Sequence, residues 1–302
     1  MIEVEYLRHI DEQRYNEFLY RVSDSHIFHT PEWKKVIERS FNLKPYYIIA
    51  KNSNGTIVGA LPFFYVKKLT KKKLTSLPFS IYGGVIATDL NCINSLIQEL
   101  FKLKETLSCD FVEIKQPPNN QYNILLEKNS LRGVQIRVDQ YIPLKPPIVL
   151  WNKLKRSCYT AIKRAKKKGI IVKRINDKNY LNKIYNLEVL TRKRLGIPIP
   201  RFDYYLNLWK FLYPKYLEIF VSEKDDDILS SDIFLKFRNT ILGMHNASTI
   251  EGRRLGANTL MIWEAIKWGY QEGYKIFDFG STPDISKEGV SPKYDGLFTY
   301  KN

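Results

Sequence analysis

The sequence has little cysteine and no long apolar run. Its 302 residues include three cysteines, which is too few for a disulfide framework, and none forms a CxxC pair or a Cys/His cluster typical of zinc. No segment approaches the roughly 18 apolar residues of a membrane-spanning helix. The first residues are acidic where a signal peptide is basic and then apolar. These absences predict a cytoplasmic protein without a metal site.

The sequence also lacks the short motifs of several enzyme classes. It contains no P-loop, no GxSxG nucleophile elbow and no HExxH zinc motif. The four histidines are scattered along the chain, and a lone histidine is more often structural than catalytic. His245 is the best candidate among them for contacting substrate, because it lies in a predicted strand just before a loop.

Acidic residues are missing from one long segment of a basic chain. The protein has 48 Lys and Arg against 31 Asp and Glu, a net charge of +17, yet residues 151–174 contain no Asp or Glu. This segment attracts polyanions such as RNA, anionic lipid or a nucleotide-linked substrate, unless it is only a solvated helix face. Its basic residues are Lys153, Lys155, Arg156, Lys163, Arg164, Lys166, Lys167, Lys168, Lys173 and Arg174.

The order of the predicted elements repeats in the two halves of the chain. Each half shows a strand hairpin, a loop, an amphipathic helix and a short strand. The fold class that we expect is therefore α/β with mixed sheets, built as two copies of one unit. Prolines at 143, 146 and 147 indicate the joint, so we predict domains at 1–145 and 146–302. The predicted elements are strands 46–50, 57–66 and 111–114 with helix 93–107, then strands 216–221, 228–237, 240–248 and 275–279 with helix 258–272.

Two local patterns support this assignment. Thr30 and Pro31 are typical of a helix start, with Thr30 as the cap and Pro31 in the first turn. After the joint, apolar residues at helical spacing predict a single helix over 151–168 with one core-facing side and basic residues on the others. The apolar residues of that pattern are Trp151, Leu154, Cys158, Ala161, Ile162 and Ala165.

Residues 251–258 (EGRRLGAN) precede a predicted helix and form a candidate anion site. Free backbone N–H groups and the helix dipole at such a position favour negative charge. The segment resembles the Arg/Gln-x-x-Gly-x-Gly/Ala loop with which GNAT acetyltransferases hold the pyrophosphate of CoA. Arg253 and Gly256 fit that pattern, whereas Asn258 stands where Gly or Ala is expected. In the alternative interpretation, Asn258 only caps the helix.

An ordered series of motifs resembles the FemABX-like proteins over nearly the whole chain. The series includes a basic AIKRA segment at 161–165 followed by KGI at 168–170, and a closing GLFTYK at 296–301. Tyr159 stands where the family usually has Arg, and Ile37 where muropeptide-binding relatives have Lys. The other matching segments are 28–33, 57–62, 76–79, 82–84, 196–202, 256–260, 263–265 and 277–281.

The resemblance implies two tandem GNAT-like domains and an N-acyltransferase that moves an aminoacyl or acyl group to an amine of a cell-envelope or glycan precursor. Characterised relatives use charged tRNA and build peptidoglycan. Lys301 matches a lysine that stabilises the developing oxyanion. Arg201 and Tyr205 match an Arg-x-x-x-Tyr pair that holds acceptor phosphates. Asp278 is the second catalytic candidate or else a turn cap, and Gly280 and Ser281 shape the substrate site.

The resemblance leaves the donor open between aminoacyl-tRNA and acyl-CoA, each as a co-substrate and with no bound cofactor. We favour charged tRNA because the CoA loop is degenerate and the neighbouring helix is basic. A non-enzymatic protein that binds RNA or an anionic surface is the alternative from another class, and peripheral membrane contact is a third. The acceptor and the oligomeric state stay open. The predicted tRNA contacts are Lys163, Arg164, Lys166, Lys167 and Lys168.

Overall fold

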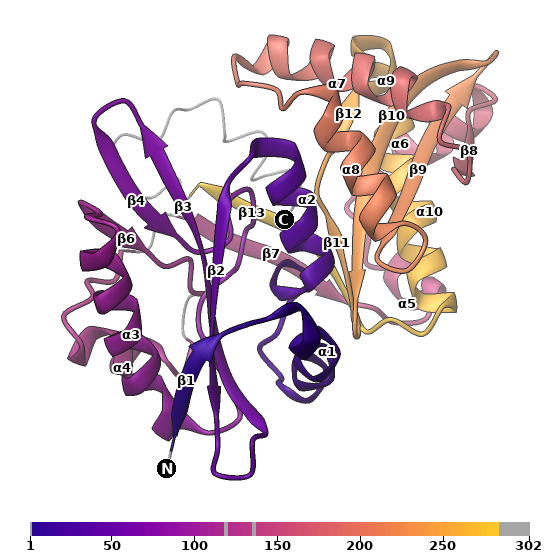
Figure 1. Cartoon of the computed structure of the whole chain (residues 1–302). Helices are drawn as coiled ribbons and strands as arrows, with labels where there is room; N and C mark the ends of the chain where they lie inside the picture. The colour runs from indigo at the N-terminus through magenta and orange to yellow at the C-terminus, as the bar shows by residue number, and fades with distance from the viewer. Residues whose placement is uncertain (1, 118–119, 135–136, 284–302) are drawn as a thin grey trace. The chain divides into compact units, whose positions relative to one another are not determined.

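The computed structural model describes residues 2–117, 120–134 and 137–283 and contains two compact units, residues 1–136 and 137–302. Each unit has one mixed sheet with helices packed against it, which confirms the expected α/β class (Figure 1). The division lies earlier than the expected boundary at residue 145. The reason is that strand β7 (Arg137–Pro143) pairs with β13 (Ile276–Pro283) in the second sheet.

The first unit contains a sheet with the strand order β1-β2-β3-β4-β6. The short strand β5 also pairs with the long strand β3. All of its strand pairs are antiparallel except β4 with β6. A turn at 52–55 joins β2 to β3 and completes the hairpin expected from strands 46–50 and 57–66. The strands are β1 (Glu3–Tyr6), β2 (Lys44–Lys51), β3 (Ile57–Lys68), β4 (Lys71–Thr75), β5 (Ile86–Ala87) and β6 (Phe111–Glu113).

The helices of the first unit begin where local chemistry predicts. In α2 the Thr30 side chain accepts a hydrogen bond from the Trp33 N–H at 3.2 Å, and Pro31 occupies the first position, so this predicted cap is confirmed. Helix α3 covers one face of the sheet with buried leucine and isoleucine side chains. The helices are η1 (His9–Asp11), α1 (Glu12–Arg21), η2 (Ile27–His29), α2 (Pro31–Phe41), η3 (Leu90–Cys92), α3 (Ile93–Thr106) and α4 (Asn123–Lys128).

The second unit contains a sheet with the strand order β7-β13-β11-β10-β9-β8, and β12 pairs with β10. Among the described strands of this sheet, β11 and β13 form the one parallel pair. Helix α10 packs its buried face against this sheet and closes the second core. The remaining strands are β8 (Ile171–Arg174), β9 (Leu217–Lys224), β10 (Asp227–Phe237), β11 (Thr240–Gly243) and β12 (Ala247–Ser248).

The helices of the second unit correct two expectations. The single helix predicted over 151–168 is divided into α5 and α6, and the loop predicted over 249–257 contains the helix α9. No helix of the described residues is both long and apolar enough to cross a membrane. The helices are α5 (Pro147–Trp151), α6 (Arg156–Lys167), α7 (Tyr180–Leu195), α8 (Phe202–Leu212), α9 (Ile250–Leu255) and α10 (Ala257–Gln271).

Candidate functional site

The parallel pair of β11 and β13 ends at a point where the second sheet opens. The two strands pair up to Leu242 opposite Asp278, after which β13 continues beside β7. The chain after β11 stays close to β10, because the Met244 N–H donates to the Ile233 carbonyl at 2.9 Å and β12 then rejoins β10. The segment between β11 and β12 therefore carries its side chains at the end of a parallel strand pair.

Three polar side chains form a connected row at this opening. The Asn246 amide donates to the Asp232 carboxylate and to the Asn258 side-chain oxygen, each at 2.9 Å. Asp232 is buried, Asn258 is half-buried and Asn246 is exposed. The row thus presents amide groups to solvent above a buried carboxylate, and such groups can bind a polar substrate and fix its orientation.

The adjacent residue, His245, belongs to a buried network that reaches two helices. Its Nδ1 lies 3.1 Å from the Glu188 carboxylate on α7, and its Nε2 lies 3.2 Å from the Tyr204 hydroxyl on α8. Glu188 also accepts hydrogen bonds from Arg192 Nε at 3.1 Å and from the Tyr205 hydroxyl at 3.3 Å. The network therefore fixes the segment between β11 and β12 to both helices.

The electrostatics of this network keep Glu188 charged. Burial alone would raise the pKa of the Glu188 carboxyl, but the hydrogen bonds and charges of His245 and Arg192 outweigh burial and hold that pKa below its usual value. Burial raises the pKa of the Tyr204 and Tyr205 hydroxyls, so both stay protonated. A carboxylate surrounded by donors is a rigid support for the neighbouring Asn246.

Arg201 and Tyr205 do not face the same space. Arg201 is the N-cap residue of α8 and its side chain is 85% exposed, whereas Tyr205 has no exposed surface and points into the network. The Arg201 guanidinium pairs with Asp203 at 3.0 Å, an exposed ion pair of small energy that a phosphate can replace. The predicted binding role of Tyr205 and His245 stays a prediction, and burial restricts it to positioning other groups.

The candidate anion loop is wound into helix and packed. Thr249 caps α9 by accepting from the Gly252 N–H at 2.8 Å, Arg253 is exposed on α9, and α10 begins directly after Gly256. Gly256 has φ +83° and lies against α6, since a Cβ there would stand 2.5 Å from the Ala161 carbonyl oxygen. Asn258 lies inside α10 and does not cap it, so the capping interpretation is wrong.

The site residues predicted on β13, Asp278, Gly280 and Ser281, are fixed by hydrogen bonds to the backbone and to Arg137. The Asp278 carboxylate accepts from the Gly280 N–H at 2.7 Å, and Gly280 has φ +75° in an irregularity of the pairing with β7. Arg137 donates to the Ser281 hydroxyl at 2.6 Å and to its carbonyl at 3.1 Å. Asp278 thus supports a turn, and its catalytic role stays a prediction. Lys301 lies outside the described residues.

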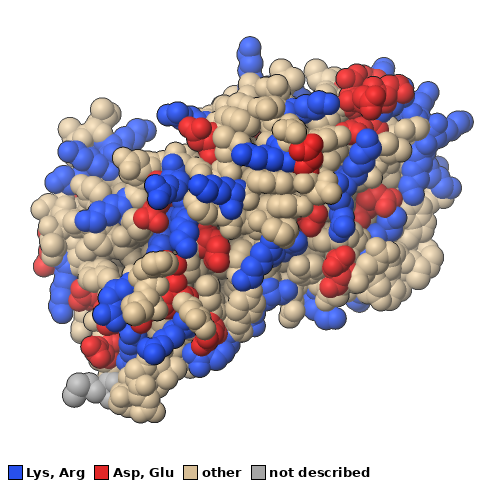
Figure 2. All heavy atoms as spheres, turned by 45° about the vertical axis from the view of Figure 1, so that its right-hand side comes forward, with Lys and Arg blue, Asp and Glu red and all other residues tan. Residues whose placement is uncertain are grey.

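Helix α6 separates apolar from basic side chains as the sequence predicted. Ile162 and Ala165 are buried in the second core. All five predicted tRNA contacts are exposed, namely Lys163, Arg164, Lys166, Lys167 and Lys168. Lys and Arg side chains outnumber acidic ones over the face drawn in Figure 2. The role of these cations in RNA binding stays a prediction.

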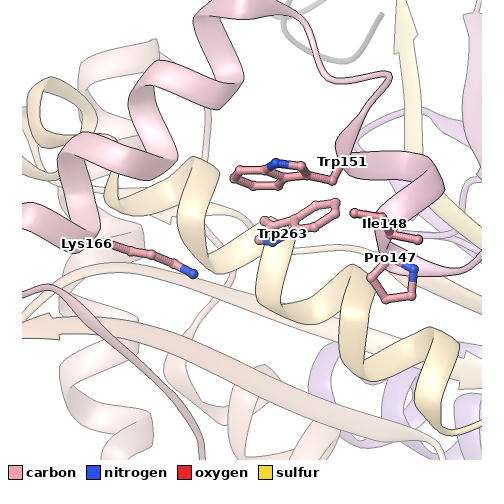
Figure 3. A pocket seen from close by; sticks show the side chains of 5 residues that line it. All are labelled: Pro147, Ile148, Trp151, Lys166 and Trp263. Atoms are coloured by element: carbon pink, nitrogen blue, oxygen red, sulfur yellow. The ribbon is translucent and has the colours of Figure 1, made fainter.

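A hollow of about 280 Å³ lies beside α6 (Figure 3). Sequence reasoning predicted that Trp151 can face the core; it packs against the second core and is half-buried on this surface. Among the described residues, no group of three or more His, Cys, Asp and Glu side chains is arranged to hold a metal ion. The residues that line the hollow are Pro147, Ile148, Trp151, Lys166 and Trp263.

Four of the residues just described were missed by sequence reasoning. Glu188 and Arg192 are one helical turn apart, a spacing that is also typical of exposed surface pairs. Asp232 lies in the middle of the strand predicted over 228–237, where a buried carboxylate is unusual, and that was the available signal. Asn246 offered no signal beyond its position next to His245.

Comparison with known proteins finds one similarity within the second unit and another over nearly the whole chain. A family model for an acetyltransferase (GNAT) domain matches residues 152–301. A UDP-N-acetylmuramoylpentapeptide-lysine N(6)-alanyltransferase of Weissella viridescens is 21% identical over 313 aligned positions, which cover 96% of this chain and 88% of the relative. The similarity therefore extends over both units.

Solved structures share the whole fold. The crystal structure of FemX matches with a TM-score of 0.78 at 15% identity, over 99% of this chain and 93% of the other. A tandem GNAT protein from the clavulanic acid biosynthesis pathway matches with a TM-score of 0.59 at 9% identity, over 99% and 94%. Both likenesses show that the fold is shared.

Proposed function

We propose that the chain is a FemABX-like protein of the GNAT acyltransferase superfamily and that it transfers an aminoacyl group to an amine of a cell-envelope precursor. The observation that carries this proposal is the end-to-end similarity to an enzyme whose name states alanyl transfer to the lysine of a UDP-linked muramoylpentapeptide. The acceptor class that we propose is accordingly a nucleotide- or lipid-linked peptidoglycan precursor in the cytoplasm.

The reaction that we propose is attack of a neutral amine on an ester carbonyl. The amine nitrogen forms a bond to the carbonyl carbon, the carbon–oxygen ester bond breaks, and the departing oxygen takes up the proton that the amine loses. The carbonyl oxygen carries negative charge in between. A cation or N–H aimed at that oxygen lowers the barrier, and removal of one such donor costs about 3–4 kcal/mol. We assign this role to Lys301.

Charged tRNA is the donor that we propose, with acyl-CoA as the alternative. Two observations support RNA. Helix α6 carries exposed cations and contains no acidic residue, and a strip of cations of this kind neutralises phosphates. The Gly256 junction, where a CoA pyrophosphate would need free backbone, packs against Ala161, and the Asn258 side chain occupies the next turn.

The acceptor is expected to contact the opening of the second sheet. Arg201 is exposed, and its ion-pair partner is the exposed Asp203, so its planar guanidinium can bind a phosphate at two points. Asn246 and Asn258 offer amide groups for the peptide or sugar part of an acceptor. Both sites lie in the unit that the acetyltransferase model matches.

The test is transfer of labelled amino acid from charged tRNA to a UDP-linked muramoylpentapeptide, with and without RNase. We expect transfer that RNase abolishes. In the Lys301→Ala variant we expect kcat to fall by about 100- to 1,000-fold, while Lys275→Ala, a matched change on the same unit, keeps its activity. Transfer that survives RNase and requires acyl-CoA would replace the proposed donor.

The basic helix also favours a second function, a non-enzymatic RNA-binding protein. In that case Lys301→Ala would leave function intact. Replacing Lys163 and Lys167 by Ala would weaken RNA binding and reduce its dependence on salt concentration. The labelled-transfer assay separates the two, because the second function predicts RNA binding without any transfer.

A further inference from the structure

The hollow beside α6 is built from aromatic rings and one cation. Figure 3 shows the Trp151 indole over the Trp263 indole, with Lys166 on one side and Pro147 and Ile148 on the other. Its volume of about 280 Å³ is at the small end of the range for ligand sites, about 300–1,000 Å³. The hollow therefore suits one flat ring and not a whole dinucleotide or CoA molecule.

The two indoles have different roles in the hollow. Trp263 is only 5% exposed and belongs to the second core, whereas Trp151 is half-buried and lies against it with ring centroids 5.2 Å apart. Tyr159 of α6 contacts the Trp151 ring on another side, at 5.1 Å. Trp151 is thus held in place by two aromatic neighbours while part of its ring stays open to a ligand.

Cations stand directly beside these rings. Lys166 lines the hollow and pairs with Glu264 at 3.6 Å, and the Lys163 ammonium lies 4.4 Å from the centre of the Tyr159 ring. Both lysines are exposed. Exposed pairs of this kind contribute at most about 1 kcal/mol, so a phosphate can take over either lysine at little cost.

We propose that this hollow holds an unpaired nucleobase of an RNA strand whose phosphates lie along α6. Aromatic side chains next to a strip of cations are the usual platform for single-stranded nucleic acid, because every base has a stacking face and every nucleotide a phosphate. The inference rests on the proposed function to the extent that the strand is the single-stranded end of the donor RNA.

An anionic membrane is a weaker match for the same surface. Among the described residues from 147 to 168, the exposed large aliphatic side chains are Ile148 and Val149, which is little area to insert between lipids. The aromatic part of the surface is a shallow, open hollow, and Trp263, which is 5% exposed, lies too deep to reach out of it. An aromatic hollow accepts a ring, whereas insertion into lipid needs a protruding apolar wedge.

Two RNA hairpins test the proposal with the full chain. One carries a four-nucleotide single-stranded 3′ extension, and the other carries the same extension with abasic residues, so that the two have equal charge. Stacking adds about 1–3 kcal/mol per base, so wild type should bind the first hairpin about 5- to 100-fold more tightly. The Trp151→Ala variant should bind both hairpins nearly equally, and Trp151→Phe should keep part of the preference.

Two control variants separate stacking from charge and from general damage. Trp209→Ala removes another half-buried tryptophan, one stacked on Tyr213 at 3.9 Å in α8, and should leave the preference unchanged. Lys163→Ala with Lys167→Ala should weaken both hairpins alike and lower the slope of log K against log salt by about 1.4.

Equal binding of the two hairpins by wild type would overturn the proposal, as would a preference that survives in Trp151→Ala. Loss of binding to phosphatidylglycerol vesicles in Trp151→Ala, with the RNA preference intact, would assign the hollow to lipid instead. Labelled transfer separates this test from the proposed function. If labelled transfer occurs but the two hairpins bind equally, only the base-binding role of the hollow is rejected. If the hairpins bind with a Trp151-dependent preference but no transfer occurs, only the proposed function is rejected.

Discussion

The two sheets open at equivalent places, but polar side chains close the opening in the first unit and leave an exposed amide row in the second. In the first unit, the pairing of β4 with β6 ends at Thr75 opposite Glu113, and side chains that follow β6 then bond back to β5 and to the residue before it. Gln116 bonds both backbone groups of Val85, at 2.9 and 3.3 Å, and the Tyr122 hydroxyl bonds both backbone groups of Ala87, at 3.1 and 2.9 Å. The gap is closed by the unit's own polar groups.

In the second unit the corresponding opening lies where the β11–β13 pairing ends, with β12 beside β10 and the rest of β13 beside β7, and the Asn246 side chain there is exposed. Asn246 and Asn258 line it above the buried Asp232, and β13 turns to pair with β7 beyond Asp278. The network around Glu188 supports this segment from below. One arrangement of strands thus gives a closed scaffold in the first unit and a polar surface available to a ligand in the second.

The largest expected effect is at Glu188, the centre of the support in the second unit. Glu188→Gln removes a buried charge and leaves Arg192 without its carboxylate, so we expect the free energy of unfolding to fall by about 3 kcal/mol. Urea unfolding followed by tryptophan fluorescence measures this, because four of the five tryptophans lie in the second unit.

A matched change in the first unit provides the control. Glu113 pairs with Lys73 in a partly exposed position, so Glu113→Gln should cost at most about 1 kcal/mol. Equal costs for the two variants would mean that the Glu188 network does not support the opening.

The first unit should respond to pH through His29. Burial lowers the pKa of His29 to about 4. Hydrogen bonds with Gly84 and His26 act in the opposite direction but are outweighed by burial. Between pH 6.5 and pH 4 the unfolded chain binds this proton and the folded chain does not. The free energy of unfolding therefore falls as the pH falls, by about 3 kcal/mol over that window. His29→Gln should remove this dependence while keeping one hydrogen-bonding group.

The pH window separates the two units. The folded-state pKa of Glu188 is lowered, so its contribution is complete above the unfolded value of about 4.3 and is lost as the pH falls through the folded value. Unfolding curves at pH 7 and pH 5, compared between wild type and His29→Gln, isolate the histidine. An identical loss in both proteins at pH 5 would contradict the assignment.

A smaller effect is expected where the first unit closes its gap. Tyr122→Phe leaves the N–H and the carbonyl of Ala87 without their hydroxyl partner, and we expect a loss of about 2 kcal/mol in urea unfolding. Tyr185→Phe removes a single, partly exposed hydroxyl bond to Pro200 and should cost less than about 1 kcal/mol. A cost for Tyr122→Phe as small as that for Tyr185→Phe would mean that the gap tolerates unpaired backbone groups.

The sequence was sufficient for features that depend on near neighbours. The cap at Thr30, the turn at 52–55 and the two faces of α6 follow from residues within one or two turns of each other. The repeated order of hairpin, helix and parallel strand also follows, because each unit buries its apolar pattern in the same way.

The site depended on contacts that a local pattern does not contain. Glu188 and His245 are 57 positions apart, and only the packing of α7 brings them together. Helix α9 was missed because Gly256, which ends it, is equally typical of a loop. The break between α5 and α6 was missed because the residues after Trp151 fit both a continuing helix and a helix end. Asn258 is not the cap, since α10 begins at Ala257, two residues earlier than it would if Asn258 capped it.

The smallest expected change in stability is at the open amide row. Asn258 is half-buried within α10 and accepts one bond from an exposed amide, and alanine is the better helix former, so Asn258→Ala should change the free energy of unfolding by at most about 0.5 kcal/mol. If the amide row binds the acceptor, Asn258→Ala removes one hydrogen bond to the acceptor, and it does so equally in the ground state and in the transition state. KM for the acceptor should then rise by about 2- to 10-fold with kcat unchanged. An unaltered KM would show that the amide row of the second unit is no more a binding surface than the closed gap of the first.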